Sequence, residues 1–349
     1  MQTAKTIRWP ICESLLSFLK RFGRTHEARL LAVNITLIIF LSIFATGFFS
    51  LENVFNLMTS YAFVGILAAG LVVVLVAGSI DISMTATASI AQYLAVLAVS
   101  RYDLGWTVLF TVALGTGLLL GLINAALVTW FRISSIIVTI ALLNVYFGLL
   151  MFFTKGDPIN VLPDWYADSM AWVIAGADSN NPLILNMQIL GLVLAFVLAW
   201  FLLNRLSVGR QLRALGGNAE AAKRVGFNEL RLNMVAYGFL GLMAGLASLV
   251  QAQASQAVVP NALVGRELDV LAAVVLGGAS LTGGSGSIFG TVLGLMLLAL
   301  LQNGLILLGV SSFWIQFVTG FVFLVAVSTI AWDRKRQQSA LRRHIGAMA

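Results

Sequence analysis

The stretch "VLAAVVLGGASLTGGSGSIFGTVLGLMLLALLQNGLILLGVSSFWIQFVTGFVFLVAVSTIAW", Val270 to Trp332, contains no Asp, Glu, Lys or Arg. A helix that crosses a bilayer needs about 20 apolar residues, so this stretch alone has room for two or three spans. In the whole chain, 60% of the 349 residues are hydrophobic and 10% are charged. Soluble domains carry about 25% charged residues. The sequence therefore predicts an all-α polytopic membrane protein.

Apolar runs outside this stretch bring the predicted number of transmembrane helices to about ten. An even number returns the chain to its starting side, so both termini should lie on one face of the membrane. The predicted spans lie near residues 30–50, 56–78, 82–99, 106–130, 134–154, 183–203, 232–254, 268–281, 286–309 and 311–332.

The positions of the cations predict the orientation. If both termini are cytoplasmic, 18 of the 21 Lys and Arg residues lie on the cytoplasmic side, and the outer side keeps only Arg101, Lys155 and Arg266. Such an excess of cytoplasmic cations is the usual determinant of membrane topology. We therefore interpret the net charge of +7 as a topology signal, and we expect no nucleic acid to bind.

Three parts are predicted along the chain. Residues 1–29 form a cytoplasmic N-terminal segment, whose amphipathic stretch 12–22 either lies along the membrane interface or remains a solvated tail. Residues 30–332 form the transmembrane domain, which includes a polar cytoplasmic segment at 204–231. A basic cytoplasmic tail, 333–349, follows. In the long outer loop, the stretch "DWYADSMAWVIAG" predicts a helix at the headgroup level, with Trp165, Tyr166 and Trp172 at the interface.

An internal repeat is a further hypothesis. The segments "FRISSIIVT" (131–139) and "LGVSSFWIQFVT" (308–319) fall at opposite ends of their spans, as an inverted repeat of five spans against five would place them. A competing match, "VAGS" (76–79) against "LGGA" (276–279), has a different offset. The two matches leave the 5+5 repeat open.

Two segments interrupt the helical pattern and predict broken helices. The stretch "VAGSIDISMT" (76–85) carries Asp81, which we expect to be the only charge within a span, and "LGGASLTGGSGSIFG" (276–290) holds six glycines. Irregular backbone and carboxylates at membrane depth usually line a cavity. Alternatively, Asp81 caps the next helix, and the glycines allow close helix packing.

Uncharged polar side chains within the spans could bind a neutral, hydroxylated solute, or they could bond neighbouring helices instead. Together with the two interruptions they form the predicted translocation pathway: Asp81, Ser83, Gln92, Asn124, Asn144, Gly277, Gly278, Gln302 and Asn303.

The sequence lacks the residues that several classes of function require. The single cysteine, Cys12, excludes an internal disulfide and a thiolate metal cluster, and His26 and His344 lie in the polar ends. No lysine follows a glycine, so the chain has no nucleotide-binding P-loop. A nucleophile–base pair is also missing, so no enzyme is expected. One intramembrane charge is too few for an ion-coupled carrier, whereas a passive channel stays open on composition.

The stretch "RALGGNAEAAKRVGF", Arg213 to Phe227, predicts a short capped helix in water. Asn218 suits the N-cap, Glu220 the first turn, and two cations the last turn. Gly226 suits the left-handed position after the helix, and the paired glycines before Asn218 should let the chain turn sharply. Such a helix is either a surface that another protein binds or a connector.

The longer segment "GRQLRALGGNAEAAKRVGF" (209–227) resembles the ATPase-docking loop of ABC importer permeases of the ribose and simple-sugar family. "RELDVLAAVVLGGASLTGGSGSIFGTVLG" and "GSIDIS" resemble two further motifs of that family. Ser79, Thr85 and Ser285 depart from its pattern, which leaves the geometry around Asp81 open. The positions that match the docking loop, and that we expect to couple to an ATPase, are Gly209, Arg210, Gly216, Gly217, Asn218, Glu220, Ala221, Ala222 and Gly226.

The resemblance implies a multi-pass permease subunit in a bacterial cytoplasmic membrane, which imports a sugar or sugar-like neutral solute by alternating access. It implies a second permease, two cytoplasmic ATP-binding subunits that use ATP and Mg, and an extracytoplasmic solute-binding protein. This chain itself would hold no cofactor or metal. The alternatives are a permease for branched-chain amino acids or nucleosides, and a passive channel.

Overall fold

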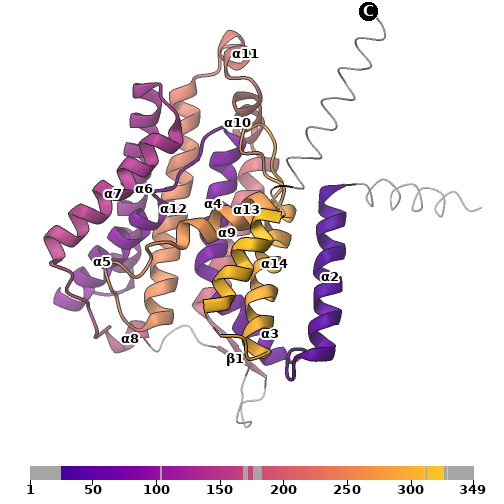
Figure 1. Ribbon diagram of the computed structural model, residues 1–349. Coiled ribbons are helices and arrows are strands. Elements are labelled where there is room, and N and C mark those ends of the chain that lie inside the picture. Colours follow the sequence, from indigo (N-terminus) through magenta and orange to yellow (C-terminus); the bar gives the residue numbers. More distant parts are fainter. Residues whose placement is uncertain are drawn as a thin grey trace, which may run out of the picture.

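The computed structural model describes residues 25–102, 104–167, 172–175, 183–311, 313–325 and 328. Over these residues the chain forms a bundle of helices with one small two-stranded sheet (Figure 1). The predicted amphipathic stretch 12–22 and the basic tail 333–349 lie outside the described residues. Two ends of the bundle can be distinguished: α11 (Ala219–Arg224) lies at one, which we call the α11 end, and α8 (Asp164–Ala167) lies at the other, the α8 end (Figure 1).

Among the described residues, six helices are long and apolar enough to cross a membrane, and a seventh span results if the bent pair α3 and α4 is counted as one. This confirms the prediction of an all-α polytopic membrane protein, but it does not confirm the number ten. Neither α5 (Met84–Tyr102) nor α13 (Arg266–Leu276) is among the six. The six are α2 (His26–Phe44), α6 (Trp106–Phe131), α7 (Ser135–Thr154), α9 (Met187–Asn204), α12 (Glu229–Ser255) and α14 (Ile288–Leu307).

One helix of the bent pair lies at the centre of the bundle. α3 (Leu51–Ser60) and α4 (Ala62–Val76) meet at 55°, and all fifteen residues of α4 are buried, whereas none of α3 is. A helix that is apolar all round is typical of a buried core or a membrane span. α12 packs closely against α6, because glycines on each helix lie against the backbone of the other, among them Gly117 of α6 and Gly241 of α12. Small residues allow this close approach.

α4 and α13 end in the same way. The amides of Gly78 and Gly278 donate to the carbonyls of Leu75 and Val275, each at 2.9 Å, and both glycines have φ near +90°. This is a Schellman cap, for which glycine is preferred. Both helices end at the α11 end and run in the same direction, so the "VAGS" and "LGGA" match reflects a shared cap. The 5+5 inverted repeat stays a prediction.

The predicted single helix in the loop at the α8 end is wrong. In the described part of this loop the helix α8 covers a single turn, and β1 (Trp172–Ala175) pairs antiparallel with β2 (Leu183–Leu185). β-branched residues dominate β1 and favour a strand, and pairing with β2 satisfies its backbone. Tyr166 is buried, and its hydroxyl donates to the carbonyl of Leu249 at 2.6 Å. Tyr166 thus anchors the loop to α12.

Candidate functional site

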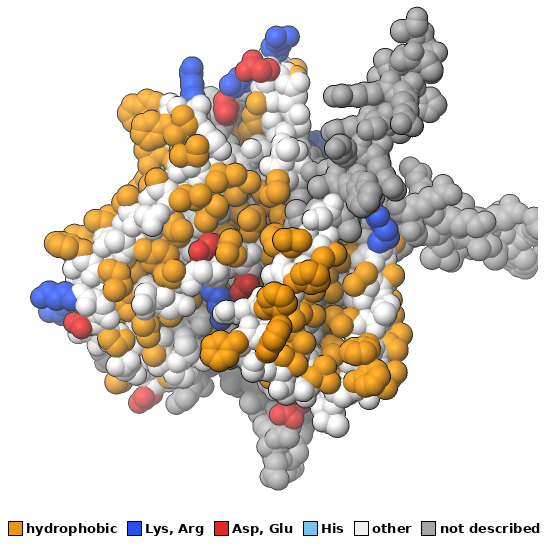
Figure 2. All heavy atoms as spheres, viewed as in Figure 1, with side chains coloured by type: hydrophobic (Ala, Val, Ile, Leu, Met, Phe, Trp, Pro, Cys, Tyr) orange, Lys and Arg blue, Asp and Glu red, His pale blue; other side chains and the backbone are white. Residues whose placement is uncertain are grey.

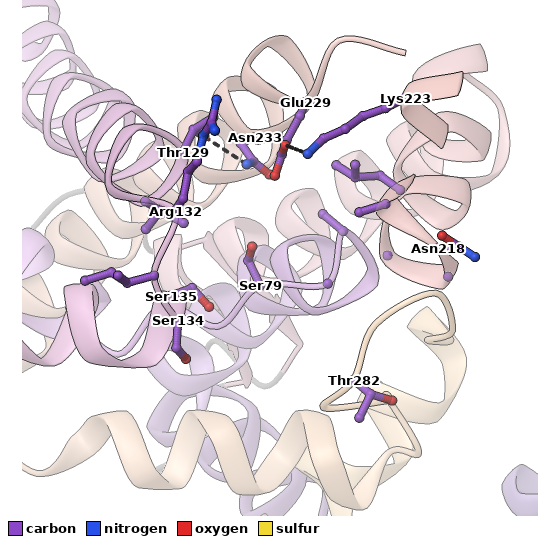
Figure 3. A pocket seen from close by; sticks show the side chains of 18 residues that line it. Ser79, Thr129, Arg132, Ser134, Ser135, Asn218, Lys223, Glu229, Asn233 and Thr282 are labelled. Atoms are coloured by element: carbon purple, nitrogen blue, oxygen red, sulfur yellow. Dashed lines mark hydrogen bonds and ion pairs between the residues drawn. The ribbon is translucent and has the colours of Figure 1, made fainter. Parts of the chain in front are cut away.

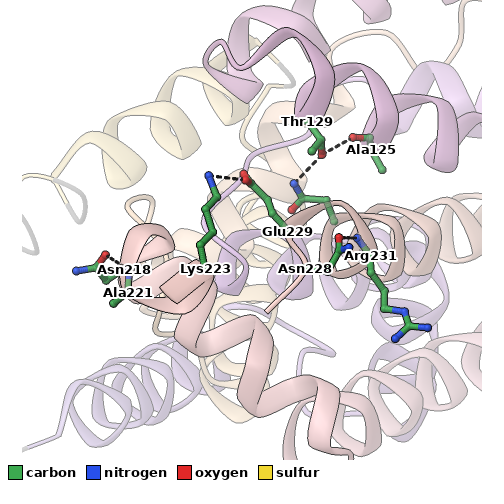
Figure 4. A network of polar contacts seen from close by, with 9 residues as sticks. Ala125, Thr129, Asn218, Ala221, Lys223, Asn228, Glu229 and Arg231 are labelled. Carbon is green, nitrogen blue, oxygen red and sulfur yellow. Dashed lines mark hydrogen bonds and ion pairs between the residues drawn. The ribbon is translucent and has the colours of Figure 1, made fainter. Parts of the chain in front are cut away.

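The predicted docking segment forms two helices at the α11 end. α10 (Ser207–Gly217) follows α9, and α11 projects beyond the ends of the neighbouring helices (Figure 1). The Asn218 side chain accepts a hydrogen bond from the Ala221 amide at 3.0 Å, so it is the N-cap of α11 as predicted (Figure 4). Glu220 lies in the first turn, and Gly226 has φ +91°. The sequence therefore predicted this helix correctly.

The role expected of the paired glycines is wrong. Gly216 and Gly217 are the last two residues of α10, and the single residue Asn218 separates the two helices. The Asn218 amide closes the last turn of α10 on the Ala214 carbonyl at 3.0 Å, which keeps both glycines helical. A methyl group at Gly217 would meet no atom within 4 Å, whereas Gly216 lies against other backbone. The two glycines are therefore not equivalent.

The two central alanines of α11 also differ. Ala221 is exposed, whereas Ala222 is only 4% exposed and packs inward. Only Ala221 can therefore contact a partner directly. Val225, just after α11, is 74% exposed and, one turn after Ala221, is a second apolar side chain open to a partner. Sequence reasoning missed it, although a lone valine between Arg224 and Gly226 was the signal.

Two other predicted coupling residues lie at the corner between α9 and α10. A methyl group at Gly209 would lie 2.5 Å from the Leu202 carbonyl oxygen, so glycine is required for this corner. Arg210 is exposed. Nearby, the Arg213 guanidinium donates to the Leu203 carbonyl at 2.8 Å and holds the corner together.

An open pocket of 770 Å³ lies beside α11 (Figure 3). Its wall includes Arg132, in the turn between α6 and α7, and the ion pair of Lys223 with Glu229 at 2.9 Å. The Glu229 carboxylate raises the pKa of the exposed Lys223 ammonium. Arg132 has φ +54° and no ion pair among the residues that the structure describes. Within the described part of the chain, Arg132 is thus a cation without an ion pair in the wall of the pocket.

A second polar network stabilises the start of α12 at the same end (Figure 4). The Asn228 side chain accepts from the Arg231 amide at 3.0 Å, and Asn233 donates to the Thr129 hydroxyl at 2.9 Å. The first bond caps α12, and the second joins α12 to α6.

Asp81 is buried in the turn between α4 and α5, with 2% of its surface exposed. One carboxylate oxygen accepts from the Ser83 amide at 2.8 Å and the Ser83 hydroxyl at 2.6 Å, and the other accepts from Asn124 at 3.0 Å. Tyr146 of α7 donates to Asn124 at 2.8 Å. The Ser83 amide precedes α5, which begins at Met84, so Asp81 closes a turn before the helix and does not cap the helix itself. Its bonds to Ser83 and Asn124 agree with the packing alternative. A role of Asp81, Ser83 or Asn124 in the pathway stays a prediction.

The remaining pathway candidates lie apart from one another. Gln92 is buried on α5, and Asn144 is exposed on α7, where it donates to its own helix. Gln302 accepts from the Tyr61 hydroxyl, and Asn303 exchanges hydrogen bonds with Asn53 of α3 at 3.0 and 3.1 Å. These bonds join neighbouring helices, as the alternative for buried amides expects.

Gly277 and Gly278 close the end of α13. A methyl group at Gly277 would lie 2.5 Å from the Gly290 carbonyl oxygen of α14. Gly278 has positive φ and packs against His26, whose ring nitrogen lies 2.9 Å from the Leu276 carbonyl oxygen. Both glycines thus serve close packing and capping here.

The expectation that Asp81 is the only charge within a span is wrong. α13 has only 11 residues, about 16 Å, which is too short to cross a membrane. Its first turn, which we call the charged turn, contains Arg266, Glu267 and Asp269. In Figure 2, acidic and basic atoms lie at mid-height among hydrophobic ones, where α13 begins. The charged residues just before a short apolar run were the signal in the sequence.

The packing of α13 on α14 gives the depth of the charged turn. The two helices run antiparallel, with Gly277 against Gly290 and Ala273 against Gly294. Tyr61, whose hydroxyl reaches the Leu298 carbonyl, interacts electrostatically with Asp269. Leu298 is near the middle of the 20-residue α14, so the charged turn lies at half depth. There, Glu267 accepts from the Thr85 hydroxyl at 3.1 Å.

Comparison with known proteins gives the family. The family described as "Branched-chain amino acid transport system / permease component" matches residues 53–327. The ribose import permease protein RbsC of Escherichia coli (strain K12) is 33% identical over 311 residues, which cover 89% of this chain and 94% of that protein. RbsC of Bacillus subtilis (strain 168) is 36% identical over 303 residues, 86% of this chain and 90% of that protein.

The autoinducer 2 import system permease protein LsrC of Photorhabdus luminescens is 31% identical over 313 residues, 88% of this chain and 91% of that protein. No solved structure matches the chain significantly. The match to the family covers most of the transmembrane bundle, including α10, α11 and the charged turn. The chain therefore belongs to the family of branched-chain amino acid transport system permease components.

Proposed function

We propose that this chain is the transmembrane subunit of an ATP-driven, binding-protein-dependent importer for a sugar or sugar-like neutral solute. The observation that carries the proposal is α11, a capped helix in water that projects from an apolar bundle with exposed Ala221 and Val225 at its surface. An ATP-binding partner can bind this surface, and α11 then transmits the partner's movement to the bundle.

The orientation and partners follow from this assignment. The α11 end faces the cytoplasm of a bacterium, in agreement with the excess of cations there. Two ATP-binding subunits, which hold ATP and Mg, bind at this end, and an extracytoplasmic solute-binding protein binds at the α8 end. This chain holds neither ATP nor a metal.

The solute pathway passes the charged turn of α13. Side-chain exposure is 48% for Arg266 and 34% for Asp269, at a depth where charges in contact with lipid are expensive. Water and a second permease subunit, not lipid, therefore cover this turn. The carboxylates of Glu267 and Asp269 can accept hydrogen bonds from the hydroxyl groups of a sugar. The pathway opens to one side and then to the other.

The relatives support a sugar as the solute, because they are named for the import of ribose or autoinducer 2. The expected scarcity of intramembrane charge is no longer an argument against an amino acid, since the charged turn could bind a zwitterion. The choice therefore rests on the relatives, and it can be tested separately from the ATPase partner.

The test uses the chain co-expressed with an ATP-binding subunit and a solute-binding protein of a ribose importer from its own genome, reconstituted in vesicles. We expect the subunits to co-purify and ATP to drive the uptake of labelled ribose but not of labelled leucine. Uptake without ATP would indicate a passive channel. ATP-driven uptake of leucine alone would refute the sugar and keep the importer.

A further inference from the structure

Three segments that are far apart in the sequence meet through their backbones next to α11: the end of α4, the last turn of α10 and the loop between α13 and α14. The Gly284 amide donates to the Val76 carbonyl at 3.1 Å. A methyl group at Gly216 would overlap the Val76 carbonyl oxygen and lie 2.6 Å from the Gly284 nitrogen. We call this contact the glycine junction.

The third segment enters the junction from the loop between α13 and α14. A methyl group at Gly283 would lie 2.5 Å from the Gly78 Cα atom and 2.6 Å from the Gly216 carbonyl oxygen. Gly78 and Gly283 both have φ +90°, a conformation that side chains disfavour. Each of the three segments therefore contributes one glycine that no other residue can replace without displacing backbone.

The glycine junction lies directly behind α11. Gly78, Gly216 and Thr282 line the open pocket on whose rim α11 begins (Figure 3), and only Gly217 and Asn218 separate Gly216 from α11. The junction also touches both broken helices, since Gly78 caps α4 and Gly283 follows the cap of α13. It is thus a direct contact between α10, the helix that leads into α11, and both interruptions in the bundle.

We propose that Gly78, Gly216 and Gly283 are positioning residues that pass a displacement of α11 to α4 and α13. The inference rests on the proposed function, because it needs a partner that moves α11. Contacts between backbones contain no rotatable side chain that could absorb a shift, and close-packed interiors transmit strain. A movement of α10 therefore moves the end of α4. Through Gly283 it also moves the loop between α13 and α14, and the charged turn lies at the other end of α13.

Two glycine variants separate the junction from the rest of the bundle. Gly216→Ala adds a methyl group in the junction, where it meets the backbone of Val76 and Gly284. Gly115→Ala on α6 adds a methyl group where no atom lies within 4 Å, and it is the reference for unchanged activity. Each variant is reconstituted with the ATP-binding subunit and the solute-binding protein.

The readouts separate coupling from assembly. We expect both variants to insert and to co-purify with the ATP-binding subunit, since α11 is unchanged. In Gly216→Ala, solute transported per ATP hydrolysed should fall about tenfold, the factor that corresponds to about 1.4 kcal/mol in an equilibrium. Gly115→Ala should keep the ratio of the unmodified complex. If Gly216 had only a structural role, less of the complex would assemble in Gly216→Ala, and the solute transported per ATP hydrolysed would stay unchanged.

Two results would overturn the inference. One is a normal ratio in Gly216→Ala, and the other is a loss of co-purification in that variant, which would mean that Gly216 shapes the docking surface. If the unmodified chain itself fails to bind any ATP-binding subunit, the proposed function fails instead.

A second measurement does not depend on the folding of Gly216→Ala. With Cys12 replaced by Ser, spin labels at Ala219→Cys and Thr282→Cys span the junction, and labels at Ala219→Cys and Gly105→Cys span the bundle. Between the nucleotide-free and ATP-bound states, we expect the first distance to stay constant and the second to change. Any other pattern overturns the inference.

Discussion

Asp81 and Asn218 both accept a hydrogen bond from a backbone amide that follows them in the chain, but they lie in two different regions. Asp81 accepts from the Ser83 amide, and Asn218 accepts from the Ala221 amide. Asn218 is exposed, and among the described residues its side chain bonds only the Ala221 amide. Asp81 is buried and also binds Asn124 of α6. The comparison shows that a local hydrogen bond of this kind can be read from sequence, whereas its energetic weight depends on what surrounds it.

The change at the buried Asp81 should give the largest effect. Asp81→Asn places an amide NH₂ group against the NH₂ group of Asn124, and a buried donor without an acceptor costs about 1–3 kcal/mol. We expect a lower thermal midpoint in detergent and impaired transport, with insertion retained. The double variant Asp81→Asn, Asn124→Asp restores an acceptor opposite the new donor and should recover part of the stability. Unchanged stability and transport in the single variant would give Asp81 no more weight than Asn218.

The two alanines of α11 come next. Ala222→Glu places a charge against packed neighbours, at a cost of about 2 kcal/mol or more, whereas Ala221→Glu places it in water. Limited proteolysis should therefore cleave α11 only in the Ala222→Glu variant. Neither variant should co-purify with the ATP-binding subunit. In Ala221→Glu the loss should come only from the disturbed contact with the partner. Equal protease resistance of the two would mean that the inward packing of Ala222 contributes nothing.

The change at the exposed Asn218 should have a smaller effect than the change at the buried Asp81. Asn218→Ala removes a single N-cap bond, which is worth about 1 kcal/mol in an exposed helix. Faster amide hydrogen exchange confined to α11 is the expected result, while Asn218→Asp, which retains the cap, should exchange at the original rate. Protection lost beyond α11 would show that this cap, like Asp81, is tied to the rest of the bundle.

The smallest effect should come from Glu220. Its carboxylate interacts with the N-terminal end of α11, an exposed interaction worth about 0.3–1 kcal/mol that salt screens. Glu220→Ala should slightly raise hydrogen exchange in α11 at low salt and not at high salt. A larger loss of ATPase binding that persists at high salt would point instead to a direct contact with a partner cation.

Prediction from sequence succeeded where the determining interactions are local. The cap at Asn218, the positive φ of Gly226 and the interrupted backbone after Val76 depend on residues within a few positions of one another. It failed where distant contacts decide. Gly217 and Ala222 match the family's motif as well as Gly216 and Ala221 do, but their surroundings differ.

The amino-acid sequence by itself determined the membrane class, the capped helix and the resemblance to the permease family, because hydropathy and capping act over one or two turns. Only the tertiary structure decided which glycines are in contact, which alanine faces water and at what depth α13 begins. The physical reason is that burial and close approach depend on segments hundreds of residues apart, such as Val76 and Gly284. No local pattern encodes the neighbour that a side chain will meet.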